Sequence, residues 1–482
     1  MLRRWERSAA RRRISAQASR RVPGTERAGP AGPAAGTDRL PQIRHIVILM
    51  MENHSYDNYL GMLAGRGDGF LIGPDGKPDG SNPTSAGVQV PLAHAPQTTQ
   101  VRFVPTQSWN ASHIQWSGGT CDGFVRSIEE TVPGGDADIP MHYWTEADLP
   151  FYYWLARTFP LATRWFSSCL GPTFPNRRFL ISGTAHGLID DVPYGMIDYP
   201  ESGTIFDHLE AHGISWVNYH QLTPLQVNWR LLSRARGLSY LRLLFGAIGG
   251  IFAGLLPALE SKVQTTAGLY PLGFLRAVNH LRPVGDFLAA ARSGSLPSVS
   301  IVDPDFTATS EENPQDIQAG EAFAAQVVSA VLAGPAWPHT LLIWLYDEHG
   351  GYYDHVPPPT AVAPDDVPAR GLYEKFPVLR LFRKTALGRK VTAADSGPRT
   401  YTQLGFRVPA VIVSPYAKPD YVTELAYDHT AILRLIQRKW NLPPLTRRDA
   451  AAADLLDALD LEGPGAFMTP PRPPAPGQAA NG

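Results

Sequence analysis

Residues 43–51 read IRHIVILMM, an apolar run of strand length that leads directly into ENHSYDNYLG at 52–61. A continuous apolar run of this length is typical of a parallel strand that is covered on both faces. Similar runs recur as ISWVNY, LPSVSIV, TLLIWLY and VPAVIVS, at 214–219, 296–302, 340–346 and 408–414. The sequence therefore predicts several buried strands of one largely parallel sheet.

Helical patterns separate these runs. They begin at Thr204 with a stop at Gly213, at Ala319 with a stop at Gly334, and at Asp428, which suits an N-cap. Strands that alternate with helices indicate an α/β fold, here a three-layer sandwich around a largely parallel central sheet with loop and helical insertions. Such sheets form their crevices at the carboxyl ends of the strands, so we expect the functional loops there.

Acidic and amide side chains follow two of the predicted strands. Glu52 and Asn53 come directly after the first run, and Asp347 and Glu348 come directly after TLLIWLY. If these strands are neighbours, the oxygens lie together, and a divalent cation would relieve the repulsion between the carboxylates. A single Glu-Asn pair is more often a solvated strand end, but the second acidic strand end favours a metal site.

A hydroxyl and two imidazoles are the other reactive candidates. Thr173, in GPTFPNRRF at 171–179, precedes a predicted helix, whose dipole and free N–H groups suit a nucleophile and a bound phosphate. An N-cap is the alternative role for this threonine. His113 and His355 fall in predicted loops, where functional residues concentrate. Each could donate to a phosphoryl oxygen or protonate a leaving alkoxide, and each could equally be a structural histidine.

The two ends of the chain and two insertions fall outside the strand-helix pattern. Residues 1–40 form a basic leader and linker and residues 461–482 a Pro-rich tail, and both are expected to be disordered. The catalytic domain is expected at 41–460, with insertions at about 62–112 and 230–285. No apolar segment of secretory-signal length follows the basic leader, so the sequence predicts no export signal.

The second insertion contains the apolar stretch LLFGAIGGIFAGLLPAL at 243–259. Glycines and a proline interrupt it, and its length is at the short end of what crosses a bilayer. A core or capping helix pair is the first interpretation, and contact with lipid or a membrane surface is the second. The 43 basic and 44 acidic residues balance, which argues against a nucleic-acid partner. Whether Cys121 and Cys169 pair is left open.

Several segments, in order from about residue 43 to 442, resemble a known family. IRHIVILMMENHSYDNYLG, GGTCDGFV, LGPTFPNRRFLISGT, TLLIWLYDEHGGYYDHVPPP and DHTAILRLIQ are similar to the bacterial phosphoesterases that include non-haemolytic phospholipases C and acid phosphatases, in the alkaline-phosphatase superfamily. The resemblance implies an alkaline-phosphatase-like sandwich. It also implies one divalent ion, either Ca²⁺, Mg²⁺, Mn²⁺ or Zn²⁺, at Glu52, Asn53, Thr173, Asp347 and Glu348, with Thr173 as the nucleophile.

The resemblance also implies residues that contact phosphate. His113 matches the family histidine that contacts the phosphoryl group, and Asn53 would hold another phosphoryl oxygen. Asn313, in Glu312-Asn313-Pro314, stands where the family usually has a histidine. An amide can donate a hydrogen bond to phosphate but cannot act as an acid. Protonation of the leaving group would then fall to His355 or to water.

The function that the sequence predicts is metal-assisted hydrolysis of phosphate esters through a threonine nucleophile. A phospholipase C-like phosphodiesterase acting on phospholipid is favoured, because the core motifs hold no basic residues beyond Arg177 and Arg178 to bind the dianion of a monoester. The alternatives are an acid phosphatase-like phosphomonoesterase and a catalytically silent family member that binds phosphoesters. The apolar stretch at 243–259 is a candidate for contact with a membrane surface, beside a core or capping helix pair and a true membrane span.

Overall fold

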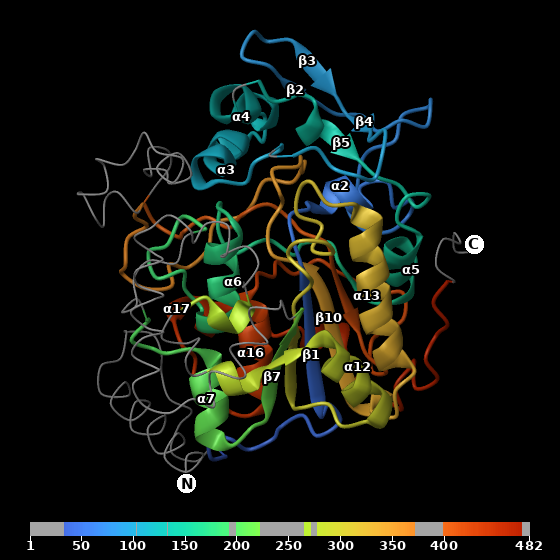
Figure 1. Ribbon diagram of the computed structural model, residues 1–482, viewed down its shortest axis with the longest axis vertical. Coiled ribbons are helices and arrows are strands. Elements are labelled where there is room, and N and C mark those ends of the chain that lie inside the picture. The colour runs from blue at the N-terminus through green and yellow to red at the C-terminus, as the bar shows by residue number, and fades with distance from the viewer. Residues whose placement is uncertain are drawn as a thin grey trace, which may run out of the picture.

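The protein is described here by a computed structural model, which covers residues 33–102, 104–132, 134–191, 199–221, 265–270, 277–371 and 399–474. These residues form three layers, with one large sheet between two groups of helices (Figure 1). The α/β sandwich predicted from the sequence is therefore confirmed. The apolar stretch at 243–259, most of the leader and the end of the tail lie outside the described residues.

A sheet of eight strands forms the middle layer. Its order is β12 (Val422–Thr423), β6 (Leu161–Ala162), β11 (Ala410–Val413), β10 (Thr340–Tyr346), β1 (His45–Met51), β9 (Val299–Val302), β7 (Trp216–His220) and β8 (Leu281–Pro283). Neighbouring strands are parallel except at β11, which runs antiparallel to both β10 and β6. The five predicted apolar runs all form strands. The remaining three strands have only two or three residues each, too few to leave a period-2 pattern.

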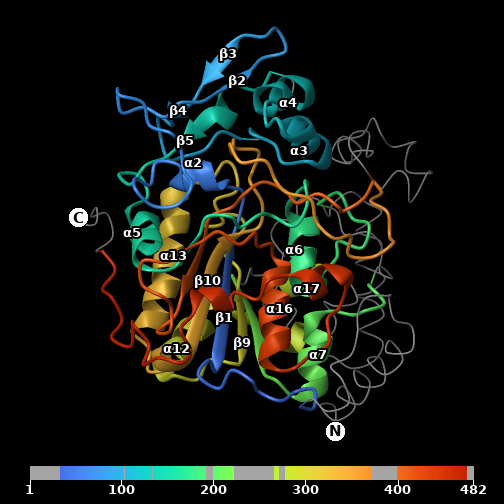
Figure 2. The same cartoon turned by 180° about the vertical axis from the view of Figure 1, so that it is seen from behind.

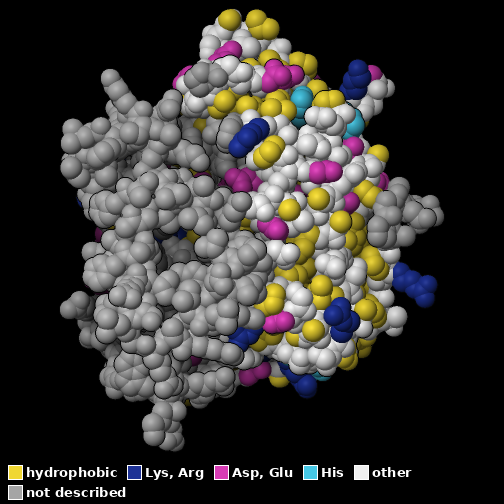
Figure 3. All heavy atoms as spheres, in the orientation of Figure 1, with side chains coloured by type: hydrophobic (Ala, Val, Ile, Leu, Met, Phe, Trp, Pro, Cys, Tyr) yellow, Lys and Arg dark blue, Asp and Glu magenta, His cyan; other side chains and the backbone are white. Residues whose placement is uncertain are grey.

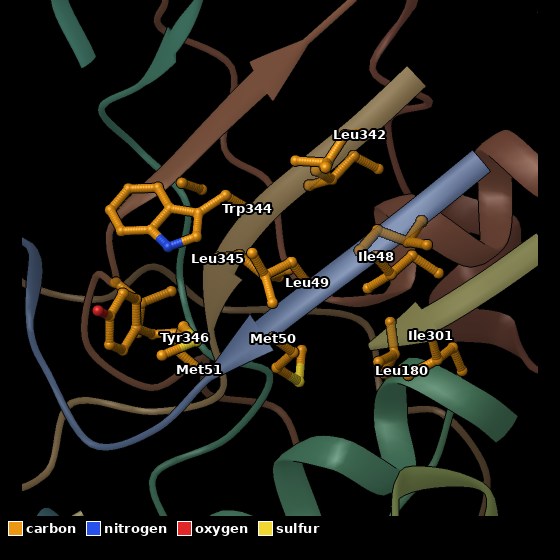
Figure 4. Packing of buried hydrophobic residues seen from close by; sticks show 14 of the residues in the cluster. Ile48, Leu49, Met50, Met51, Leu180, Ile301, Leu342, Trp344, Leu345 and Tyr346 are labelled. Carbon is orange, nitrogen blue, oxygen red and sulfur yellow. The ribbon is translucent and has the colours of Figure 1, made fainter. Parts of the chain in front are cut away.

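The central pair of the sheet, β1 and β10, is deeply buried. The two strands are parallel and in register over their whole length, from His45 opposite Thr340 to Met51 opposite Tyr346. Every residue of β10 and all but the first residue of β1 are buried. Figure 4 shows their side chains packed against one another and against Ile301 of β9. Burial on both faces is why these strands read as unbroken apolar runs.

Helices cover both faces of the sheet (Figures 1 and 2). One group consists of α6 (Thr173–Ser182), α7 (Ile205–His212), α16 (Thr430–Lys439) and α17 (Arg447–Ala451), and the other of α5 (Pro150–Thr158), α12 (Val284–Ser293) and α13 (Ile317–Leu332). The three predicted helices are α7, α13 and α16. A capping box of Thr204 and Asp207 begins α7, and Gly213 ends it in the left-handed conformation.

A cap of small elements lies over the carboxyl ends of the parallel strands (Figure 1). It contains the strand pairs β2 (Ser81–Pro83) with β3 (Gln89–Pro91) and β4 (Ala93–His94) with β5 (His142–Tyr143), and the helices α2 (Tyr56–Leu60), α3 (Trp109–Trp116) and α4 (Phe124–Thr131). The excursion predicted at about 62–112 thus contributes three short strands and the first residues of α3. Cys121 and Cys169 are both buried free thiols.

Among the described residues, no helix is both long and apolar enough to cross a membrane. The described part of the chain also has six short 3₁₀ helices. The 3₁₀ helices are η1 (Ser117–Gly119), η2 (Ile139–Met141), η3 (Thr266–Gly268), η4 (Val278–His280), η5 (Trp337–His339) and η7 (Leu456–Ala458). On the described surface shown in Figure 3, Lys and Arg side chains lie singly among apolar and polar ones.

Candidate active site

The carboxyl ends of β1 and β10 bring the first and last sequence motifs together. Because Met51 pairs with Tyr346, the next residues of the two strands, Glu52 and Asp347, leave the sheet side by side. The backbone N–H of Asn53 donates to Asp347 Oδ1 over 3.3 Å, and Asn53 has a positive φ of 69°. The predicted oxygen cluster required that the two strands be neighbours in the sheet. They are neighbours.

A glycine keeps the two chain segments in this close approach. Gly350, with a φ of +67°, lies against the backbone of Asn53, and a Cβ at this glycine would come within 1.9 Å of the Asn53 carbonyl oxygen. No side chain fits at that distance, whatever its conformation. The His349-Gly350 turn therefore fixes how closely the two acidic strand ends approach each other.

Arg177 is the positive charge at the centre of this acidic edge. Its guanidinium is fully buried, and it donates from Nε to Asp347 Oδ2 over 2.8 Å and from Nη1 to Asp303 Oδ1 over 3.1 Å. Glu52 Oε1 lies 3.6 Å from Nη2. Arg177 follows Thr173 by four residues, so the two share one face of α6. Sequence reasoning treated Arg177 only as a residue that might hold phosphate, whereas its donors are committed to the protein's own carboxylates and carbonyls.

The carboxylates around Arg177 exceed its single charge. Burial, followed by the charge of Asp347, raises the pKa values of Glu52 and Glu348 well above their ordinary range. Two buried oxygens of the predicted ligand set, Asn53 Oδ1 and Glu348 Oε1, have no hydrogen-bond partner among the described residues. A buried oxygen without a donor is costly, and a cation would satisfy it. The donor chemistry therefore fits a hard divalent ion.

The side chains as they stand do not form a finished metal site. Within the ranges that the structure describes, no three His, Cys, Asp or Glu side chains form a group that could hold an ion. Asp347 already accepts from Arg177, from the N–H of Asn53 and from the N–H of Glu348 at 2.8 Å. The ligand set predicted from the resemblance, which also counts the amide of Asn53 and the hydroxyl of Thr173, stays a prediction.

Thr173 is the first residue of α6 and is buried. The N-cap is Pro172, whose side chain makes no capping hydrogen bond, so the alternative interpretation of Thr173 as an N-cap is wrong. Helix-capping does not occupy the hydroxyl, because the preceding residue has taken that position. The next backbone N–H, of Phe174, donates to Asp191 Oδ1 over 2.9 Å.

His113 lies on α3, not in the loop predicted for it. Its Nδ1 donates to the carbonyl of Trp109 over 2.7 Å, and the two rings pack with centroids 4.6 Å apart. Burial lowers the pKa of His113. Since a carbonyl can only accept, the proton of the neutral ring is on Nδ1, and Nε2 is an acceptor. Donation from Nε2 to a phosphoryl oxygen therefore requires the imidazolium form.

Asn313 joins its own loop to the distant segment that contains Val101 and Val104. Its side-chain amide donates to the carbonyl of Val101 over 3.1 Å and to the carbonyl of Val104. Both hydrogens of the amide are thus shared with backbone carbonyls, and a phosphoryl oxygen would have to compete for them. Its predicted contact with phosphate stays a prediction.

His355 belongs to a separate ionic cluster. Its Nδ1 donates to Asp57 Oδ2 over 2.6 Å, and its Nε2 lies 3.7 Å from Asp68. The fully buried Arg407 donates to the other oxygen of Asp57 over 2.9 Å and to Asp354 over 2.9 Å. These contacts join α2 to the loop after β10. They give His355 a structural role, which the sequence left open beside a catalytic one.

The ionic cluster predicts a pH dependence of stability. Burial alone would lower the pKa of His355, but the hydrogen bond and the charge of Asp57 outweigh burial and raise it. A raised folded-state pKa stabilises the protein below the unfolded pKa of about 6.5, and this stabilisation is lost as the pH rises through the folded pKa. We expect wild type to be more stable than His355→Gln by a few tenths to about 1 kcal/mol at about pH 5.5, because the pair is partly exposed.

Urea unfolding of both proteins from about pH 5.5 to about pH 8.5 measures this difference. It should shrink steadily as the pH rises. A difference that stays constant or grows would contradict the assigned protonation of His355.

Sequence reasoning missed several residues that support the edge. His429, the residue before α16, donates from Nε2 to the backbone carbonyl of Asp347 over 2.6 Å and accepts from Trp165 Nε1 over 3.2 Å. Asp303 follows β9 and accepts from both Arg177 and Asn218. Asp303 directly follows β9, just as Glu52 follows β1 and Asp347 follows β10. The same strand-end signal could therefore have identified it.

Comparisons with known proteins show which family and which relatives this chain resembles. The model described as "Phosphoesterase family" matches residues 43–443. "Phospholipase C A" of Mycobacterium tuberculosis is 30% identical over 467 residues, which cover 93% of this chain and 82% of that protein. "Phospholipase C B" of the same organism is 31% identical and covers 94% and 82%, respectively. "Non-specific phospholipase C6" of Arabidopsis thaliana is 28% identical and covers 90% and 74%.

Proposed function

Because this chain belongs to the phosphoesterase family and is a hydrolase of phosphate esters, we propose that it is a phospholipase C-like phosphodiesterase with Thr173 as its nucleophile. One arrangement supports the proposal above all others. Arg177, one turn after Thr173 on α6, bonds Asp347 and approaches Glu52. The helix that begins with the hydroxyl is thereby tied to the acidic ends of both central strands.

The electrostatics of the edge favour a diester over a monoester. Arg177 is committed to carboxylates, and Arg178 donates to the carbonyls of Ala185 and Leu269 and stacks on Tyr270. Neither guanidinium is therefore open to a second negative charge on the substrate. A phosphodiester carries one charge, whereas a monoester above its second pKa of about 6 carries two. The relatives named as phospholipases C favour a phospholipid as that diester.

The proposed reaction has two displacements at phosphorus. Thr173 gives up its proton to solvent, its oxygen bonds to phosphorus, and the bond from phosphorus to the lipid alcohol breaks. The alcohol oxygen takes a proton from water, because Asn313 has no acidic proton and His355 is held by Asp57. A second water then attacks phosphorus, releases the phosphorylated headgroup and restores the hydroxyl.

The remaining residues of the edge would bind the divalent ion and orient the phosphoryl group of the substrate. Glu52, Asn53, Asp347 and Glu348 would hold one divalent ion, which supplies positive charge to the phosphoryl oxygens and favours the ionised hydroxyl. His113, as imidazolium, would donate from Nε2 to a phosphoryl oxygen. The negative charge of the substrate stabilises that protonated form, which offsets the effect of burial on the histidine.

Removal of divalent ions tests this proposal. We expect treatment with EDTA, followed by its removal, to lower the turnover of bis-p-nitrophenyl phosphate and phosphatidylcholine at least about 100-fold, because buried carboxylates cannot bind an anion without a cation. Single additions of Ca²⁺, Mg²⁺, Mn²⁺ and Zn²⁺ should restore turnover and identify the ion. EDTA already saturated with Ca²⁺ is the control.

Two results would count against the proposal. Full turnover by protein that elemental analysis finds free of metal would remove the ion from the mechanism. Turnover of p-nitrophenyl phosphate far above that of both diesters would replace the phospholipase with a phosphomonoesterase.

A further inference from the structure

Asp191 lies where a phosphoryl oxygen of the substrate would be expected to bind. The N-terminal amides of a helix are natural donors to phosphate, and α6 begins with the proposed nucleophile. The N–H of Phe174, the residue after Thr173, is already hydrogen-bonded to Asp191 Oδ1 over 2.9 Å. Neighbouring Cα atoms are about 3.8 Å apart, so this carboxylate lies within a few ångströms of the backbone of Thr173.

The charged groups that act most strongly on Asp191 are all acidic. Asp191 is exposed. Desolvation is the first of the causes that raise the pKa of its carboxyl above the ordinary value. Glu312, Asp347 and Asp190 add to the rise. Asp191 in turn acts on the carboxyl of Glu52. A phosphoryl group bound at Thr173 would therefore be repelled by the carboxylate of Asp191 and by the acidic residues near it.

We infer that Asp191 is a specificity-determining residue, whose carboxylate beside Thr173 disfavours dianionic phosphomonoesters relative to monoanionic phosphodiesters. The inference rests on the proposed function, because it requires the phosphoryl group at Thr173. Each additional negative charge on the substrate is repelled by the ionised carboxylate, and the effective dielectric near a protein surface is too low to cancel this repulsion. The same contact also explains how the helix N-terminus stays satisfied before substrate binds.

Replacement of Asp191 by asparagine separates charge from capping. The asparagine keeps an oxygen that accepts from Phe174 N and removes the charge. We expect the ratio of kcat/KM for p-nitrophenyl phosphate to kcat/KM for bis-p-nitrophenyl phosphate, at about pH 8, to rise about ten-fold. Asp191→Glu, which keeps the charge, should leave the ratio near that of wild type. Increased salt should reduce the difference in this ratio between wild type and Asp191→Asn, because salt screens the repulsion between the carboxylate and the substrate.

Asp316 offers a matched control elsewhere in the fold. Its side chain accepts from the N–H of Gln318 at the start of α13, so it is also a carboxylate on a helix N-terminal amide. Asp316→Asn should leave the ratio unchanged. An unchanged ratio in Asp191→Asn, or an equal rise in Asp316→Asn, would overturn the inference.

A second variant and a separate readout keep the test decisive. If Asp191→Asn does not fold, Asp191→Ser supplies the same measurement, because its hydroxyl also accepts from an N–H and carries no charge. Failure of the proposed function gives a different result, namely diester turnover that survives Thr173→Ala, and this result would overturn both. Diester turnover that depends on Thr173, with a ratio indifferent to Asp191, would overturn the specificity role alone.

Discussion

Thr173→Ala should lower kcat for diester hydrolysis at least about 1,000-fold while the protein stays folded. Alanine removes the oxygen that would bond to phosphorus and leaves only the binding and positioning groups. The fold should tolerate the change, because Pro172 is the N-cap of α6 and the side chain of Thr173 does not cap the helix. Steady-state kinetics with bis-p-nitrophenyl phosphate and phosphatidylcholine, together with thermal unfolding, measure both effects.

Thr173→Ser is the matched control, because it keeps the hydroxyl and loses only a methyl group. It should retain activity within about ten-fold of wild type. Acid-quenched protein should carry a phosphoryl adduct on residue 173 in wild type and in Thr173→Ser, and mass spectrometry of the corresponding peptide detects it. Turnover by Thr173→Ala at the rate of wild type would show that water attacks directly.

Arg177→Met should destabilise the protein by about 3 to 5 kcal/mol, the range measured when one partner of a buried ion pair is removed. The guanidinium is fully buried and is bonded to Asp347 and Asp303. Methionine fills much of the volume but leaves these carboxylates buried without their counter-charge. Chemical denaturation of wild type and variant gives the difference in the free energy of unfolding.

A second mutation tests the electrostatic origin of this loss. Asp303→Asn in the Arg177→Met background removes one of the stranded charges, so it should recover part of the stability that Arg177→Met loses. The same Asp303→Asn change in wild type should destabilise, because there it removes a negative charge that is paired with Arg177. If the two changes simply add, packing rather than charge explains the importance of Arg177.

The strands of the fold were predictable because burial on both faces leaves a continuous apolar run in the sequence. The run at 340–346 is the whole of β10, with every residue buried, and no other described element has so plain a signal. The shorter β6 and β12 pair over one or two residues at the sheet edge, which is too short for any period. Helix α3 was not predicted, because polar and apolar residues do not alternate on it with a clear helical period.

The candidate site was predictable only in its acidic part. Glu52 and Asp347 directly follow strands that read as apolar runs, so a rule about strand ends identifies them from the amino-acid sequence alone. The ties made by Arg177, His429 and Asp191 join segments far apart in the chain, and spacing carries no information about such contacts. His355 was a catalytic candidate because the sequence places it in a loop. Its contact with Asp57, which gives it a structural role, could not be predicted from the sequence.

The antiparallel direction of β11 has a consequence for how this protein can diversify. A connection to a parallel neighbour must cross over from the carboxyl end of one strand to the amino end of the next. The antiparallel strand β11 instead starts beside the carboxyl end of β10. The connection between them therefore departs from and arrives at the same rim, the one that carries Asp347. Lengthening a surface connection costs little loop-closure entropy. Insertions there can remodel what the rim recognises while every strand keeps its register, so substrate range can change independently of the sheet.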